Sequence, residues 1–144
     1  MKVKCIGTTM GDHIPPGIDW RSIPSADENM LHNLTIDKEY TVYGISTIKK
    51  YSWYLICEDH FDGKYTIYPM YVFHRYFVIT DGRLSRYWVA VDSTDHFDSD
   101  QRIIEFGFKE WVTEEFFYSK LVDDAKREAD IFLKYKELMD SEFR

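Results

Sequence analysis

The chain has 144 residues, the size of one ordinary domain and enough to bury a core without disulfide or metal support. Aromatic residues make up 17% of it and hydrophobic residues 44%, so the composition excludes a disordered chain. Its net charge of −7 argues against binding of duplex nucleic acid or anionic membranes by bulk charge, and favours a basic partner.

The N-terminal segment lacks the continuous apolar run of a signal peptide, and no stretch of about 18 apolar residues follows it. We therefore expect a cytoplasmic protein without membrane contact. Cys5 and Cys57 stand far apart and belong to no paired motif. Two reduced thiols are expected.

The first part of the chain is expected to be mainly β-structure. Residues 2–6 alternate polar and apolar and predict an edge strand because of their lysines. Residues 8–33 contain several Pro and Gly residues and predict a long loop. The next strand is expected over 39–48, where Gly44 indicates a bulge or a close backbone approach.

The middle of the chain predicts a buried strand followed by a hairpin. Residues 51–57 are apolar on both faces and predict a central strand covered on both sides. The Asp-Gly pair at 62–63 is a hairpin signal that leads into a strand over 64–68. Pro69 is expected to end that strand, and residues 71–73 to form a short turn.

Two further strands and a polar loop are expected before the helical part. Residues 76–80 and 86–91 predict a strand, turn, strand unit around the Asp-Gly pair at 81–82. Residues 92–100 predict a polar loop, and residues 103–108 a final strand.

The last part of the chain predicts an amphipathic helix over 113–140. Thr113 can cap its start, and a break is expected near Ser119, because one helix of this length would span about 40 Å. The apolar side consists of Phe117, Leu121, Ala125, Phe132, Tyr135 and Met139.

Residues 34–91 resemble the small Src-homology-3-like barrels of many bacterial proteins, several of which serve as immunity proteins. The resemblance lies in the strand Lys38-x-Tyr40-x-Val42, the Tyr-Pro turn at 68–69 and the strands around them. It implies a small, strongly bent antiparallel sheet or barrel, and a protein that binds a toxin domain directly. With the long C-terminal amphipathic helix, the expected fold class is α+β.

The expected organisation is a single domain over 1–144. Residues 1–108 are mainly β, and residues 109–144 form a helical C-terminal extension packed on the sheet.

Two acidic clusters are the candidate partner-binding residues. The first consists of Glu58, Asp59 and Asp62, and the second of Asp92, Asp95, Asp98 and Asp100. Carboxylates at this spacing can pair with the Lys and Arg side chains that a nuclease uses to hold phosphate. The alternative for the second cluster is a solvated acidic loop. A calcium loop is not indicated, because glycine at the sixth position and glutamate at the twelfth are missing.

No motif in the sequence indicates catalysis. The five histidines are scattered, Cys57 and His60 lack the further ligands of a zinc site, and the glycines form no phosphate loop. We therefore predict no enzyme, cofactor or metal. Together with the negative net charge, the resemblance to immunity proteins implies a protein that neutralises a basic nuclease-type toxin domain.

Two other hypotheses remain open. One is a small hydrolase that uses His74 or His60 with a nearby carboxylate. The other is a phage or bacterial accessory module that binds nucleic acid or a regulator through the aromatic side chains of the sheet. These aromatic residues are Trp53, Tyr54, Tyr65, Tyr68, Tyr71, Tyr76, Tyr87 and Trp88.

Overall fold

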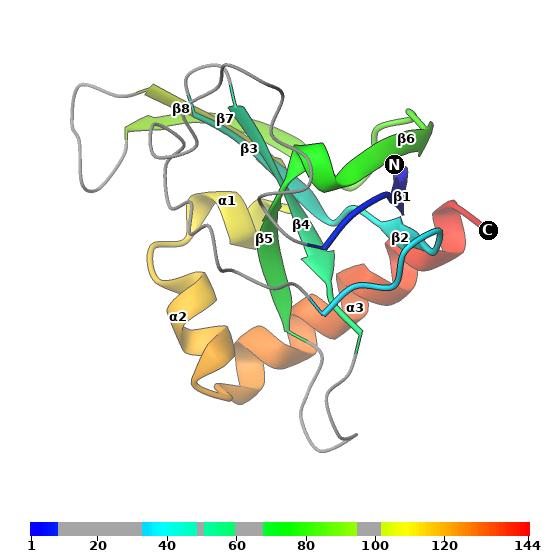
Figure 1. The fold of residues 1–144 in the computed structure, drawn as a ribbon. Helices are drawn as coiled ribbons and strands as arrows, with labels where there is room; N and C mark the ends of the chain where they lie inside the picture. Colours follow the sequence, from blue (N-terminus) through cyan, green and yellow to red (C-terminus); the bar gives the residue numbers. More distant parts are fainter. Residues whose placement is uncertain (9–32, 49–50, 60–67, 95–101) are drawn as a thin grey trace.

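The computed structural model describes residues 1–8, 33–48, 51–59, 68–94 and 102–144 (Figure 1). Within these residues, strands come first along the chain and α-helices last, so the predicted α+β class is confirmed. The strands are β1 (Lys2–Cys5), β2 (Glu39–Thr41), β3 (Gly44–Ile48), β4 (Tyr51–Cys57), β5 (Pro69–Phe73), β6 (Phe77–Asp81), β7 (Val89–Thr94) and β8 (Arg102–Gly107), with a 3₁₀ turn η3 (His74–Tyr76) between β5 and β6.

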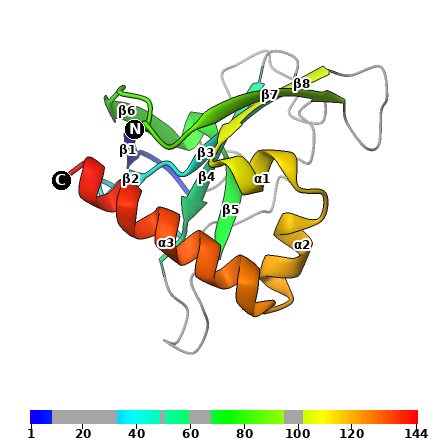
Figure 2. The ribbon, with the colours of Figure 1, turned by 180° about the vertical axis from the view of Figure 1, so that it is seen from behind.

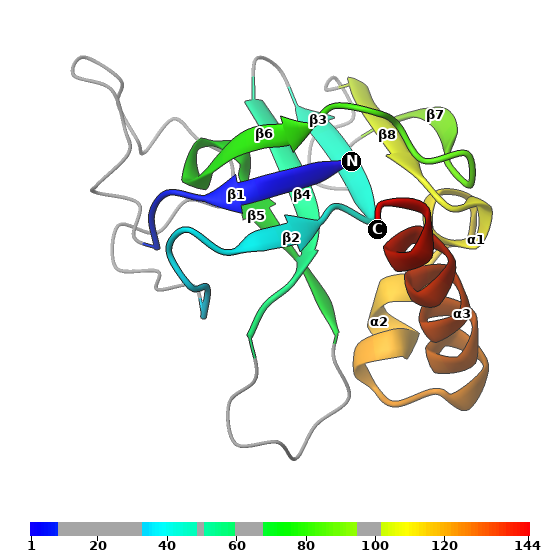
Figure 3. The ribbon, with the colours of Figure 1, turned by 90° about the vertical axis from the view of Figure 1, so that its right-hand side faces the viewer.

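The described strands form two antiparallel sheets. The smaller sheet has the order β2-β1-β6, and the larger has the order β5-β4-β3-β8-β7. One core lies between the two sheets and a second lies between the larger sheet and the helices (Figure 3). No closed or curled barrel is found among the described strands.

Strand β4 is central, as its sequence predicts, because it pairs with β3 on one side and β5 on the other. Tyr54 and Ile56 pack into the core between the sheets, whereas Leu55 and Cys57 pack toward the helices. The apolar residues on both faces of this strand therefore join the two cores.

Three helices follow the strands: α1 (Lys109–Thr113), α2 (Phe117–Val122) and α3 (Lys126–Glu142). Helix α3 crosses the large sheet on the face seen from behind (Figure 2). The predicted apolar side is confirmed: Phe117, Leu121, Phe132 and Met139 are buried, and Ala125 and Tyr135 pack partly buried on the same core or beside it.

The expected C-terminal helix is present as α3, but its predicted start at Thr113 and the break near Ser119 are wrong. Thr113 is the last residue of α1, and its hydroxyl donates to the carbonyl of Lys109 within that helix instead of capping a new one. Phe116 and Asp124 have φ angles of 65° and 60° and interrupt the helical backbone on either side of α2. Left-handed residues end right-handed helices, so two breaks occur instead of one.

Two strand predictions need correction where the small sheet joins the large one. β1 is not an edge strand, because it lies between β2 and β6. Residues 39–48 are not one strand, because the chain changes sheets at Val42 and Tyr43. The Val42 N–H donates to Met1 O at 3.1 Å, beside β1, and the Tyr43 N–H donates to Leu55 O at 2.9 Å, in β4.

Three more predictions, on strands and a loop between residues 69 and 94, are wrong. Pro69 does not end a strand but begins β5, an edge strand, where its missing N–H is tolerated. β6 and β7 do not form a hairpin, because they belong to different sheets. Residues 92–94 continue β7 instead of starting a loop. Residues 9–32 of the loop expected over 8–33, the hairpin at 62–63, and residues 64–67 of the strand expected over 64–68 lie outside the described residues.

Candidate functional site

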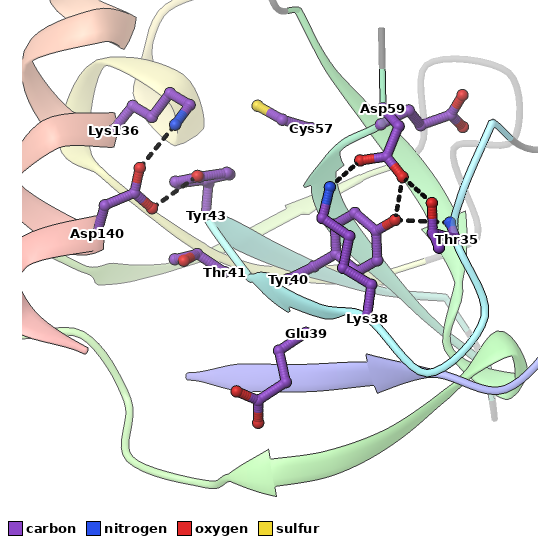
Figure 4. Close-up of a pocket in the computed structure, with 11 residues that line it drawn as sticks. Thr35, Lys38, Glu39, Tyr40, Thr41, Tyr43, Cys57, Asp59, Lys136 and Asp140 are labelled. Atoms are coloured by element: carbon purple, nitrogen blue, oxygen red, sulfur yellow. Dashed lines mark hydrogen bonds and ion pairs between the residues drawn. The ribbon is translucent and has the colours of Figure 1, made fainter. Parts of the chain in front are cut away.

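One hollow among the described residues, here named the Asp59 pocket, opens where the end of β4 meets the segment before β2 and the last turns of α3 (Figure 4). Its volume is about 510 Å³. The described residues that line it are Thr35, Lys38, Glu39, Tyr40, Thr41, Tyr43, Cys57, Glu58, Asp59, Lys136 and Asp140.

Asp59 holds one end of this pocket together. One carboxylate oxygen accepts from the ammonium of Lys38, and the other accepts from the hydroxyls of Thr35 and Tyr40, both at 2.6 Å. Partial burial by itself raises the pKa of Asp59, but these three donors outweigh it and hold the pKa below its ordinary value. The carboxylate therefore stays charged and ties the end of β4 to the segment before β2.

The other end of the pocket is also satisfied internally. The Tyr43 hydroxyl donates to Asp140 at 2.8 Å, and the Lys136 ammonium contacts the second oxygen of the same carboxylate at 2.6 Å. Burial raises the pKa of the Cys57 thiol to about 12, so this sulfur remains protonated and unreactive. We interpret the Asp59 pocket as a structural junction between strands and helix.

A further hollow, here named the acidic groove, lies between β5, the paired strands β7 and β8, and the connection from α1 to α2. It has a volume of about 1090 Å³. Its described lining residues are Tyr71, Asp92, Arg102, Glu105, Trp111, Val112, Thr113, Glu114, Glu115, Phe116, Phe117, Tyr118 and Ser119. This lining thus contains four carboxylates but only one guanidinium, so its net charge is negative.

Two of the four carboxylates form ion pairs with arginines of the same chain. Arg102 hydrogen-bonds to Asp92 across the β7–β8 pair and lowers the pKa of that carboxyl. Arg127 reaches both oxygens of Glu114 at 2.8 Å, and this hydrogen bonding lowers the pKa of Glu114. Both groups therefore remain negatively charged well below neutral pH.

A third carboxylate is held by a chain of hydrogen bonds. The indole N–H of Trp111 donates to the Tyr71 hydroxyl at 2.7 Å, and that hydroxyl donates to Glu105 at 3.2 Å. Burial and the charge of Glu105 raise the pKa of Tyr71, so the hydroxyl keeps its proton. The chain fixes the direction of the Glu105 carboxylate on the groove wall.

Phe116 is the most unusual residue of the groove. Its side chain is 62% exposed, and its φ of 65° is in the left-handed region. Asp37 and Asp124 also have positive φ, but short polar side chains tolerate this conformation much better than an aromatic one. Strained backbone of this kind clusters at functional sites, so Phe116 is a candidate contact residue.

The structure places three of the seven predicted site residues. Asp92 lines the acidic groove, whereas Glu58 and Asp59 line the Asp59 pocket, so the two predicted clusters do not meet in the described residues. Glu58 also accepts a hydrogen bond from the backbone N–H of Asn33 at 3.1 Å. Four predicted residues, Asp62, Asp95, Asp98 and Asp100, lie outside the described part of the chain.

Sequence reasoning missed the residues that define the groove: Glu105, Glu115, Phe116 and Tyr118. A signal was present in the run Glu-Glu-Phe-Phe-Tyr over 114–118. Within this run Phe117 is buried, whereas Phe116, which precedes α2 with a left-handed φ, and Tyr118 are exposed. The predicted helix start at Thr113 places Glu114 and Glu115 in a first helical turn, where acids are also favoured by the helix dipole.

The histidine proposed for catalysis packs among aromatic rings. The ring centroid of His74 lies 4.9 Å from that of Phe73 and 6.4 Å from that of Tyr54. Burial lowers its pKa, and the charge of Arg75 lowers it further. No hydrogen bond joins this ring to a carboxylate within the described residues, and His60 lies outside them.

The sheet offers little open aromatic surface. Trp53, Tyr54 and Tyr76 are buried, and the other described aromatic residues proposed for base stacking are partly buried. The one remaining residue of that set, Tyr65, lies outside the described residues.

No family model, curated protein or solved structure matches the chain. Both cysteines are free, as the sequence predicts. Among the residues placed by the structure, no helix is long and apolar enough to cross a membrane. The same residues contain no group of three or more His, Cys, Asp or Glu side chains arranged to hold a metal ion.

Proposed function

We propose that this protein is an immunity protein that binds and neutralises a cognate bacterial toxin domain, a basic nuclease, by direct protein–protein contact. The acidic groove carries this proposal, because the exposed Phe116 and four carboxylates line the same hollow, and two of these carboxylates already pair with arginines of the chain. Interfaces depend on a few such aromatic anchors surrounded by polar side chains. A nuclease surrounds its phosphate site with Lys and Arg, which complement the carboxylates.

Inhibition by this route needs no chemistry from the inhibitor. Carboxylates that occupy the cationic substrate cleft compete with the phosphates of the nucleic acid, and the net charge of −7 accelerates the encounter with a basic protein. The resemblance of residues 34–91 to Src-homology-3-like barrels supports this proposal only because several proteins with such barrels are immunity proteins. The described strands form two sheets and no barrel, so the fold itself adds no support to the resemblance.

Capture from the native host tests the proposal. The tagged protein is recovered at increasing salt, and any stoichiometric partner is identified by mass spectrometry and then expressed alone and together with this protein. We expect one basic partner that is toxic alone and harmless in co-expression, and a complex that weakens as salt screens the charges. A captured protein that is harmless alone would contradict the proposal.

Two charge reversals localise the contact. Glu115 lines the acidic groove, whereas Glu137 is exposed on α3 and lies outside the described linings of both hollows. Because both substitutions to lysine change the net charge equally, only the position differs. We expect Glu115→Lys to lose protection against the toxin and Glu137→Lys to protect like the wild type. Equal protection by the two variants would show that the groove is not the contact.

A further inference from the structure

The walls of the acidic groove combine two features that suit one kind of side chain. Aromatic rings come from Trp111, Phe116 and Tyr118, and the Trp111 and Tyr118 rings meet edge to face with centroids 5.6 Å apart. Carboxylates come from both sides, with Glu105 on β8 and Glu115 before α2. A group that stacks on rings and also donates several hydrogen bonds can use both.

We propose that the acidic groove binds an arginine side chain of the partner, with the guanidinium plane against the exposed rings of Phe116 and Tyr118 and its N–H groups on the carboxylates of Glu105 and Glu115. The partner's identity rests on the proposed function, but the chemistry of the groove does not.

Arginine fits this groove better than lysine for two physical reasons. A guanidinium is planar and weakly hydrated, so it stacks on aromatic faces while its five N–H groups reach carboxylates in the same plane. An ammonium is compact and strongly hydrated, and it gains less from a ring that remains partly in water. Phe116, at 62% exposure, offers a large part of its ring for such stacking.

The groove is also prepared in advance for a charged donor. The hydrogen bonds from Trp111 to Tyr71 and from Tyr71 to Glu105 hold the Glu105 carboxylate in place before a partner arrives. Because this acceptor is already fixed, binding loses less conformational entropy. The chain already pairs guanidinium groups with the neighbouring carboxylates Asp92 and Glu114, so the wall suits this chemistry.

Three matched peptides test the inference without the natural partner: acetyl-Gly-Arg-Gly-amide and its lysine and citrulline counterparts. Each is titrated into the isotope-labelled full chain, and the backbone amide signals of residues 113–119 are followed by NMR. We expect saturable shifts with the arginine peptide, binding about threefold weaker or more with lysine, and no shift with neutral citrulline. Equal binding of arginine and lysine, or no shift in 113–119, would overturn the proposal.

Variants assign the binding to the two walls. We expect Phe116→Gly and Glu115→Gln to lose the arginine-dependent shifts, and Glu137→Gln to keep them, because Glu137 lies outside the described lining. If all three variants respond like the wild type, the arginine site is not in the groove. If the peptides do not bind but a toxic partner is captured, only the arginine site is rejected. Peptide binding without a toxic partner would reject the proposed function alone.

Discussion

Replacing Phe116 with glycine is expected to weaken binding of the captured partner by about 30-fold or more without lowering stability by more than about 1 kcal/mol. Glycine adopts the observed φ of 65° freely and relieves a left-handed strain of roughly 1–2 kcal/mol. This gain offsets the small burial that a 62% exposed ring loses. Titration calorimetry measures the affinity, and thermal unfolding measures the stability.

Two further variants separate the ring from the backbone. Phe116→Asn keeps a residue that tolerates the left-handed conformation, so it should lose binding in the same way as the glycine variant. Leu133→Ala removes an exposed apolar side chain of α3 and should bind normally. If Phe116→Gly binds with wild-type affinity, or unfolds more easily by several kcal/mol, then Phe116 serves packing instead of contact.

Replacing Gly44 with alanine is expected to destabilise the fold by about 1–3 kcal/mol. Gly44 pairs with Gly107 where β3 and β8 pass closely, and an added Cβ would lie 2.9 Å from the backbone oxygen of Phe106. The next nearest atom, in the Leu55 side chain, lies at an ordinary contact distance of 3.5 Å, so the clash is with a backbone oxygen that can move only with its strand. Chemical denaturation should show the loss directly, and the melting temperature should fall by roughly 4–12 °C.

Gly82 provides the matched control. An added Cβ there meets its nearest atom, in the side chain of Ile79, at an ordinary 3.8 Å. Gly82→Ala should therefore leave stability unchanged or raise it by about 0.4–1 kcal/mol, because the unfolded chain loses freedom. Equal stability of the two variants would mean that the close approach at Gly44 relaxes without cost.

Local patterns predict those parts of the fold that depend on one segment alone. The apolar residues on both faces of β4 indicate its central position, and the helical spacing of Phe117, Leu121 and Phe132 indicates the buried side of the helices. The close backbone approach at Gly44 is likewise confirmed. Each of these follows from a few neighbouring residues.

Pairing between distant segments is not encoded in such patterns. Gly44, directly after the change of sheets at Val42 and Tyr43, indicates a bulge or a close approach but not a move to another sheet. Val42 and Tyr43 are both buried, and only their N–H groups, which donate to different partners, reveal the change. The position of β1 between two strands also depends on residues about 40 and 80 positions away. Alternation alone could not show it, because lysines on the face of a sheet resemble lysines at its edge.

In the candidate site too, the sequence predicts local features but not the contacts between distant segments. Counting carboxylates in the sequence identified Asp92, but the groove around it is assembled from β5, the β7–β8 pair and the segment between two helices. The exposure of Phe116 depends on a positive φ that its residue type disfavours. Residue preferences therefore cannot predict the feature that supports the function best.

Photo-crosslinking tests the central claim most directly, because it does not require the partner to be known. Benzoylphenylalanine is placed at Tyr118, in the acidic groove, or at Leu133, an exposed position of α3, and each protein is irradiated inside the native host. We predict one adduct with a basic protein from position 118 and none from position 133. An adduct from position 133 alone, or none from either position, would contradict binding through the groove.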